Sequence, residues 1–215
     1  MDAVLDNRDV FVDGFMTTIT LTLLAAMGAL VLGTLIAAMR VSPAPPLRWV
    51  ATGYVEVVRN TPLTVVFFLS VFGLPKVGVG TTFFRFSLIA LTVYTASFVA
   101  EAVRSGVNSV ASGQAEASRS IGMTFVKTLR LVVLPQAFRN IIPPLASVFI
   151  ALLKNTSIAS AFAVTEATQT MQGLINTNGQ AVIWILSATA LGYVALALTA
   201  GLLFSRLERT LTVSR

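Results

Sequence analysis

Composition and the placement of charges predict an all-helical, polytopic membrane protein with about five membrane-spanning helices. Of the 215 residues, 55% are hydrophobic and only 11% are charged, and the mean hydropathy is +0.83. These values lie outside the usual range of soluble domains. The charges are clustered and leave uncharged windows at 14–39 and 167–205, each long enough to cross a hydrocarbon core about 30 Å thick.

The N-terminal segment, residues 1–13, is expected to be retained and to lie outside the membrane. Its Asp residues stand where a signal peptide needs a basic region, and the apolar run that follows is longer than the core of a signal peptide. The first span then ends at Arg40, where several prolines predict a turn.

The later spans follow from the same alternation of apolar runs and polar turns. The fourth contains Pro143 and Pro144, which a membrane helix tolerates when neighbouring groups satisfy the freed carbonyls. The predicted membrane domain covers 14–208, with a tail at 209–215. The predicted spans are residues 14–39, 51–74, 86–104, 137–153 and 181–204.

The basic residues predict the topology. If the N-terminus is outside, the segments 40–59 and 104–139 and the C-terminus lie inside and carry most of the Arg and Lys residues, as the positive-inside rule requires. The chain is therefore expected to be a multi-pass membrane protein with its N-terminus outside and its C-terminus inside. The inside residues are Arg40, Arg48, Arg59, Arg104, Arg119, Lys127, Arg130, Arg139, Arg206, Arg209 and Arg215, against Arg8, Lys76 and Arg85 outside, with Lys154 unassigned.

Several classes of function are disfavoured by composition. The chain has no Cys and no His, which removes disulfides and the commonest metal ligands, so no metal site is expected. The net charge of +6 is explained by topology, because no basic patch is interleaved with aromatic residues as in nucleic-acid-binding proteins. With nine acidic residues and no His, a membrane-embedded enzyme is disfavoured.

The long inner loop, 105–136, contains a short predicted helix over 114–121, with Ser112 as its N-cap and Gly122 as its C-cap. So short a helix is unstable alone in water and needs a surface to pack on. Small residues such as Ala115 suit insertion into a cleft of another protein. A helix lying on the lipid headgroups is the alternative.

The same loop carries the most specific motif of the chain. Residues 116–135 resemble, in register, the E-A-A-x3-G-x9-I-x-L-P loop of permeases of ATP-binding-cassette (ABC) importers. Ser118 replaces the second Ala and Val132 the Ile, both of similar size. Further segments resemble the polar amino-acid permeases, the HisMQ-type family, and the chain as a whole resembles most the glutamate-type permeases of actinobacteria. These segments are 58–63, 100–123, 134–145 and 152–160.

This resemblance implies a type I ABC importer permease (MetI-like) fold and the import of a polar amino acid, glutamate-like favoured, by alternating access. In that family the short helix is the coupling helix, which docks in a groove of the cytoplasmic ATPase. The residues carried over to this role are Gln114, Glu116, Ala117, Ser118, Arg119 and Gly122.

The implied partners are two ABC ATPase subunits, an extracytoplasmic amino-acid-binding protein, a second permease subunit, identical or sister, and membrane lipid. No nucleic acid is expected. The chain lacks the phosphate-binding motif G-x-x-x-x-G-K-[ST], so it is expected not to be an enzyme and to hold no cofactor, with ATP and magnesium bound by the partner ATPase. A passive channel or secondary carrier is the alternative function.

Ionisable and polar groups in or beside the spans are the candidates for a substrate pathway, because such groups are costly in a membrane. Simpler roles stay open: Lys154 can reach the headgroups, Glu101 and Arg104 can form a local ion pair, and Glu166 can lie on a solvated outer face or at an outer gate. Asn60 stands where the family usually has Gly, and Asn also tolerates the left-handed backbone of a tight turn. The pathway candidates are Arg59, Asn60, Thr61, Glu101, Lys154, Asn155, Thr156 and Glu166.

Overall fold

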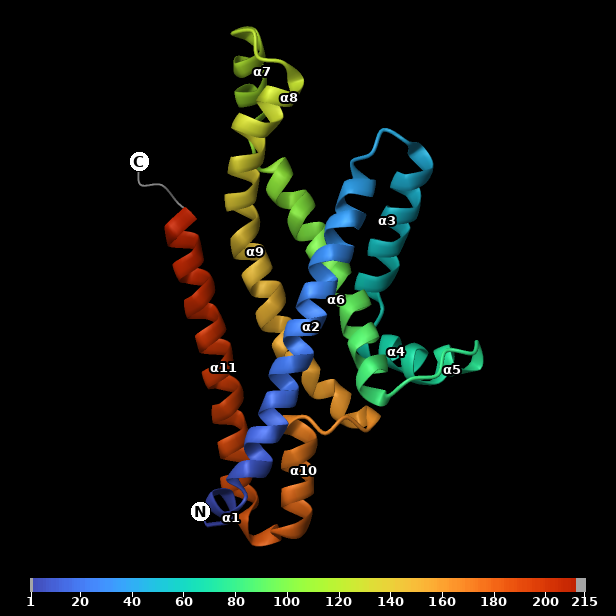
Figure 1. Ribbon diagram of the computed structural model, residues 1–215, viewed down its shortest axis with the longest axis vertical. Helices are drawn as coiled ribbons and strands as arrows, with labels where there is room; N and C mark the ends of the chain where they lie inside the picture. Colours follow the sequence, from blue (N-terminus) through green and yellow to red (C-terminus); the bar gives the residue numbers. More distant parts are fainter. Residues whose placement is uncertain (1, 212–215) are drawn as a thin grey trace.

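The computed structural model describes residues 2–211, which form an elongated bundle of helices without a strand among them (Figure 1). Four helices in this range are long and apolar enough to cross a membrane, or five if one bent pair counts as a span. The predicted fold class is confirmed. The long helices are α2 (Arg8–Arg40), α3 (Pro45–Asn60), α6 (Phe83–Asn108), α9 (Leu134–Asn155) and α11 (Val182–Leu211).

Shorter elements connect the long helices. Several are π-helical (η1 and η2) or 3-10 (η3 and η4), and they stand where one long helix ends and the next begins. They are α1 (Asp2–Asp6), α4 (Leu63–Phe68), η1 (Leu69–Gly73), α5 (Leu74–Lys76), α7 (Ser112–Ser120), α8 (Phe125–Thr128), η2 (Leu129–Val133), η3 (Thr156–Phe162), α10 (Ala167–Thr177) and η4 (Gly179–Ala181).

Helices α2 and α6 pack along each other through small residues. Ala25, Ala29 and Gly33 of α2 are buried on this side, and a Cβ added to Gly33 would lie 2.7 Å from the carbonyl oxygen of Ala96 in α6. Small residues let two membrane helices approach closely, which compensates for the weak hydrophobic drive between helices in lipid. This pair forms the frame on which the other elements are placed.

The predicted second span, 51–74, is not one helix. Helix α3 and the segment Leu63–Lys76 are bent by 109° relative to each other. Pro62 supplies no amide proton and excludes the helical backbone from the residue before it, so Thr61 is extended at φ −92° and ψ 133°. The chain turns sideways there, as α4 and α5 show in Figure 1. Asn60 is the last residue of α3, so the expected left-handed backbone at this position is wrong.

The other helices extend beyond the predicted spans. Helix α2 already begins at Arg8, within the segment expected to precede the membrane, because Phe11 is buried against Leu174 of α10 and Ile185 of α11. Helix α9 starts at Leu134 and α6 runs on to Asn108. Apolar contacts therefore continue the helices past the ends of the most hydrophobic windows.

The long loop 105–136 contains the predicted short helix as α7 (Figure 1). Its N-cap residue is Ala111 rather than Ser112, and no side chain caps its first turn. Gly122 has φ +91°, as expected of a residue that ends a helix in the left-handed conformation. The loop then continues through α8 and η2 into α9.

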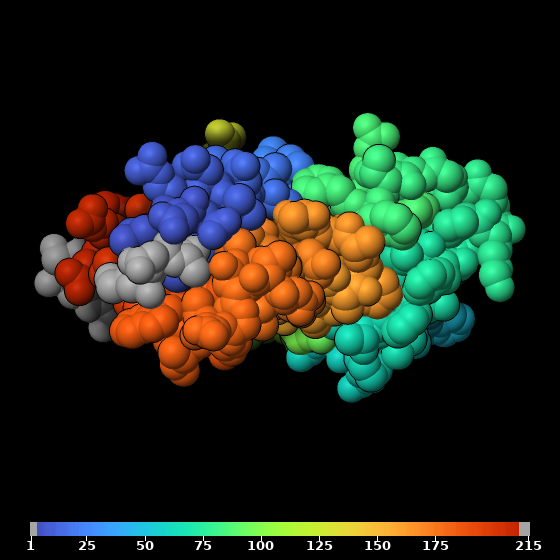
Figure 2. Space-filling view, turned by 90° about the horizontal axis from the view of Figure 1, so that it is seen from below, coloured from blue at the N-terminus to red at the C-terminus, as the bar shows by residue number. Residues whose placement is uncertain are grey.

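The opposite end of the molecule is a layer of short elements. Figure 2 views this end and shows the start of α2, the α10 region and the α4–α5 region side by side. Helix α10 packs against α2 and α11, with Ala167, Thr170 and Leu174 buried. The polar stretch 166–180 is therefore a packed cap on the bundle.

Candidate functional site

One carboxylate joins three helices in the interior of the bundle. Glu101 of α6 lies 2.5 Å from Nη1 of Arg40 at the end of α2 and 3.7 Å from Nη1 of Arg59 in α3. Arg104, one turn further along α6, also pairs with it. The predicted local pair of Glu101 and Arg104 therefore exists, but it belongs to a larger cluster with two more guanidinium groups than the carboxylate can neutralise.

Arg59 connects this cluster to a hollow between α6 and α9. Its guanidinium carbon lies 5.2 Å from the ring centroid of Phe98, an attractive cation–π geometry. Phe98 lines a hollow of about 350 Å³, a size that suits a small molecule. Asn155 also lines it, so the structure brings Arg59, Glu101 and Asn155 into one region. The lining residues are Tyr94, Thr95, Phe98, Ser147, Val148, Ala151, Leu152 and Asn155.

The pathway candidates Asn60, Thr61, Lys154 and Thr156 do not line this hollow. Asn60 donates from Nδ2 to the carbonyl of Glu56, and the Thr61 hydroxyl donates to the carbonyl of Val57. Thr156 is fully buried, and its hydroxyl donates to the carbonyl of Leu153. Lys154 is exposed at the end of α9, next to the predicted break where η3 begins.

Glu166 lies far from this region and is fully buried at the N-terminus of α10. Its Oε1 accepts the backbone N–H groups of Thr168 and Gln169 at 2.8 and 3.0 Å, and its Oε2 accepts the hydroxyls of Tyr193 and Thr18 at 2.7 and 3.3 Å. The carboxyl group thereby caps α10 and joins it to α2 and α11. The predicted solvated face is wrong, because these four donors replace water around the carboxyl oxygens.

Replacing Glu166 by Leu is expected to destabilise the protein by about 2 to 4 kcal/mol, because an N-cap is lost and buried donors are left without partners. Thermal unfolding in detergent measures this. Tyr193→Phe, which removes one of the four donors, should cost only about 1 kcal/mol. Equal unfolding midpoints for Glu166→Leu and the native chain would contradict the capping role.

The six residues predicted for coupling lie together at the tip of the long loop. Gln114, Glu116, Ala117, Arg119 and Gly122 are exposed, whereas the Ser118 side chain is buried and its hydroxyl donates to the carbonyl of Gln114 at 2.8 Å. Beyond the helix, Ile121 is 81% exposed, Phe125 67% and Val126 68%. A short helix with such an apolar rim presents a surface suited to contact with another protein.

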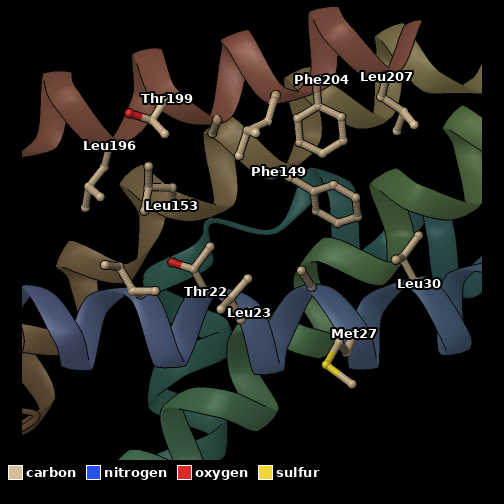
Figure 3. A pocket seen from close by; sticks show the side chains of 14 residues that line it. Thr22, Leu23, Met27, Leu30, Phe149, Leu153, Leu196, Thr199, Phe204 and Leu207 are labelled. Carbon is tan, nitrogen blue, oxygen red and sulfur yellow. The ribbon is translucent and has the colours of Figure 1, made fainter. Parts of the chain in front are cut away.

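A separate hollow of about 520 Å³ lies between α2, α9 and α11 (Figure 3). Its walls are hydrocarbon side chains and Met27, with hydroxyls only from Thr22 and Thr199. Figure 3 shows Leu23, Phe149, Phe204 and Leu207 directed into the space between the helices. Such a surface offers no partner for the charges of a polar solute, so this hollow is no candidate for a polar route.

Comparison with known proteins assigns the chain to a family. Residues 11–213 match the family described as "Binding-protein-dependent transport system inner membrane component". This chain belongs to that family. The helices long enough to cross a membrane agree with this assignment, because the family consists of the membrane components of transport systems.

Relatives of this inner membrane component match most of its length or nearly all of it. It is 41% identical over 213 residues to the "Glutamate transport system permease protein GluC" of Corynebacterium glutamicum, covering 94% of this chain and 93% of the relative. It is 44% identical over 153 residues to the "Probable glutamine ABC transporter permease protein GlnM" of Bacillus subtilis, covering 71% of each.

Solved structures resemble the component in fold. A structure titled "Crystal structure of an amino acid ABC transporter with histidines" superposes with a TM-score of 0.90 at 34% identity, covering 96% of both chains. An inward-facing MetNI methionine ABC transporter superposes with a TM-score of 0.76 at 20% identity, over 96% of this chain and 98% of that one, and shows the fold alone. The predicted type I importer permease fold is confirmed.

Sequence reasoning missed several residues of this inner membrane component. In the sequence, Arg40 indicates the end of a span but not an ion pair with Glu101. Nothing in the sequence distinguishes Phe98, which contacts Arg59, or Tyr193, which donates to Glu166, from other aromatic residues of the core. The available signal for Arg40 was its charge at a helix end, but its partner lies 61 positions away in the chain. Nothing local in the sequence indicates that pairing.

Proposed function

We propose that this inner membrane component is the permease subunit of an ABC importer for a polar amino acid, with a glutamate-like substrate favoured. The observation that carries the proposal is the similarity over nearly the whole chain to permeases named for glutamate transport. The E-A-A loop on an exposed short helix and the membrane-length helices agree with this assignment.

The hollow beside Arg59 is the proposed route of the substrate. A glutamate-like molecule carries two carboxylates and one ammonium group, so it needs an excess of cationic donors along its path. The cluster of Arg40, Arg59 and Arg104 around Glu101 supplies that excess of positive charge, and Arg59 is held by Glu101 only at 3.7 Å. Asn155 and the hydroxyls of the hollow offer neutral donors and acceptors to the same molecule.

Helix α7 is the proposed docking element for a cytoplasmic ABC ATPase. It is exposed and short, and it lies between the membrane-length helices α6 and α9 in the chain. Movement of the ATPase against α7 would switch the bundle between inward- and outward-facing states by rigid-body displacement of helices. ATP and magnesium are bound by that partner, and the energy of hydrolysis enters through it.

The proposed assembly contains two ATPase subunits, an extracytoplasmic amino-acid-binding protein and a second permease subunit, identical or a sister chain. We place the N-terminus outside and the C-terminus inside a bacterial cytoplasmic membrane, because the basic residues concentrate on the connections 40–59 and 104–139. Five membrane-spanning helices are too few to surround a path for the substrate across the membrane. This supports the pairing of two permease subunits.

Copurification followed by transport tests this function. The tagged permease, expressed with the ATPase and binding protein encoded beside it, should retain the ATPase in detergent and should drive ATP-dependent uptake of labelled glutamate into vesicles. Unlabelled glutamate should compete better than unlabelled leucine. Uptake without ATP and without an associated ATPase would instead assign the chain to passive channels or secondary carriers.

Lys154→Ala is expected to slow uptake about two- to tenfold without changing assembly, because Lys154 adds positive charge at the outer end of α9, where an anionic substrate enters. Initial uptake rates in vesicles measure the effect. Lys76→Ala removes an exposed charge elsewhere and should leave the rate unchanged. Native kinetics in Lys154→Ala would exclude Lys154 from the substrate pathway.

A further inference from the structure

The packing beneath α7 is incomplete. The helix stands at the tip of the molecule, away from the main bundle, and packs against α8 and η2 (Figure 1). Only one of its nine residues, Ser118, is buried. A hollow of about 220 Å³ lies between α7 and the α8–η2 segment, bordered by Ala115, Glu116 and Leu129. Tight side-chain packing therefore does not by itself fix α7 to the helix that follows the loop.

A polar contact joins α7 directly to the first turn of α9. Nε2 of Gln136 in α9 donates a hydrogen bond to Oε1 of Gln114 in α7. The same amide donates to the carbonyl oxygen of Val132 at 2.8 Å. Val132 belongs to the π-helical turn η2, where the regular hydrogen-bond ladder is interrupted. Gln136 thus links three elements: the short helix, the irregular turn and the long membrane helix.

Two further contacts fix the same part of α9 to α6. Nδ2 of Asn140 donates to Oγ of Ser109 at 2.7 Å, just beyond the end of α6. One residue further along α9, Ile141 lies so close to Gly106 that a Cβ on that glycine would lie 2.2 Å from Cγ1 of Ile141. Gln136 and Asn140 are four residues apart and therefore share one face of α9. The two ends of the connection 109–114 are held on that face.

The opposite end of α9 lies at the proposed substrate route. Asn155 is the last residue of α9 and lines the hollow next to Phe98. Helix α9 runs without a break from Leu134 to Asn155, although Pro143 and Pro144 lack the amide protons of two helical hydrogen bonds. Displacement of its first turn therefore reaches Asn155 through a continuous helix, with the two prolines as the points where the helix can bend.

We propose that the Gln114–Gln136 hydrogen bond is the mechanical link through which displacement of α7 moves α9. Gln136 is a positioning residue: it contacts neither substrate nor nucleotide, and it holds the short helix in register with the membrane helix. This inference rests on the proposed docking of α7 on an ATPase. It adds the element of the permease that receives the displacement and the side chains that transmit it.

The test compares Gln136→Leu and Gln114→Leu with the native chain in the full importer, reconstituted in vesicles with its ATPase and binding protein. Gln136→Leu should retain the ATPase on copurification and hydrolyse ATP at the basal rate. Gln114→Leu lies on the docking helix itself, so it is compared only by the uptake obtained per ATP hydrolysed. Substrate uptake per ATP hydrolysed should fall about three- to tenfold, the scale expected for losing one neutral hydrogen bond. Gln114 is exposed, so Gln114→Leu provides the test even if Gln136→Leu folds poorly.

Two further variants distinguish a specific role of the Gln114–Gln136 hydrogen bond from a general contribution of these side chains to the fold. Gln114→Glu keeps an acceptor for the Gln136 amide and should couple uptake to hydrolysis within twofold of the native chain. The double variant Gln114→Leu with Gln136→Leu should be no worse than either single variant, because both remove the same contact. Additive losses in the double variant would overturn the proposal.

Three other outcomes would contradict the proposed link. Native coupling in both Leu variants would overturn the link while leaving the importer function intact. Loss of the ATPase from Gln136→Leu would place Gln136 in docking rather than transmission, and would overturn the link too. If the native chain itself retained no ATPase, the proposed function would fail together with this inference.

Discussion

Glu116→Lys is expected to abolish the stimulation of ATP hydrolysis by the substrate-loaded binding protein while leaving membrane insertion intact. Glu116 is exposed on α7 and borders the hollow beneath it, so its carboxylate is available to a partner. Reversing a charge in a protein interface typically costs several kcal/mol, because it leaves the partner's charged group unpaired. Stimulated hydrolysis should fall at least about thirtyfold, to the basal rate.

The matched control for this variant is Glu208→Lys. Glu208 is an exposed glutamate near the C-terminal end of α11, outside the long loop, and the substitution makes the same change in net charge. It should retain stimulated hydrolysis within about twofold. Normal stimulation in Glu116→Lys, measured in reconstituted vesicles, would remove α7 from the coupling role.

Glu101→Leu is expected to destabilise the fold about as strongly as Glu166→Leu. It removes the carboxylate shared by three arginines, and the Arg40 side chain, only 11% exposed, is left as an uncompensated charge. Removing one partner of a buried ion pair costs about 3 to 5 kcal/mol, and the greater exposure of Arg59 and Arg104 places the expected loss near the lower bound, about 3 kcal/mol. The midpoint of thermal unfolding in detergent should fall markedly.

Glu101→Asp and Glu56→Gln serve as controls for the cluster. Glu101→Asp keeps the charge at a shorter reach and should recover part of the stability. Glu56→Gln changes an exposed glutamate of α3 and should stay within about 0.5 kcal/mol of the native chain. An unchanged unfolding midpoint in Glu101→Leu would show that the arginines find other partners and that the cluster does not hold the three helices together.

The features predicted best from the sequence are those encoded by neighbouring residues. Apolar runs identified four of the spans, Gly122 indicated the end of the short helix, and the E-A-A motif identified the loop that α7 occupies. Each depends on residues within a few turns of one another, so a linear pattern carries the signal. Pro62 is part of the sequence pattern as well, but the apolar run around it predicted one continuous span at 51–74, whereas the chain turns sideways at this proline.

The site was predicted less completely because its contacts join distant parts of the chain. Glu101 was recognised as a costly charge in the membrane, yet its partner Arg40 lies 61 positions earlier. Glu166 was expected near the outer gate or on a solvated face, but the hydroxyls of Thr18 and Tyr193 enclose it. Neither pairing has a periodicity or spacing that a sequence pattern could reveal.

By itself, the sequence determined that this chain has several membrane-length apolar segments, which loop carries the E-A-A motif, and that the family is one of transport components. Hydrophobicity and local helix signals suffice for this, since they act over a few residues. The tertiary structure decided which charges meet, where the second span bends away and how Gln136 joins the short helix to α9. The contacts depend on close helix approach at small residues such as Gly33 and Gly106, which brings distant side chains within hydrogen-bond reach. The bend follows from Pro62, which keeps Thr61 out of the helical conformation.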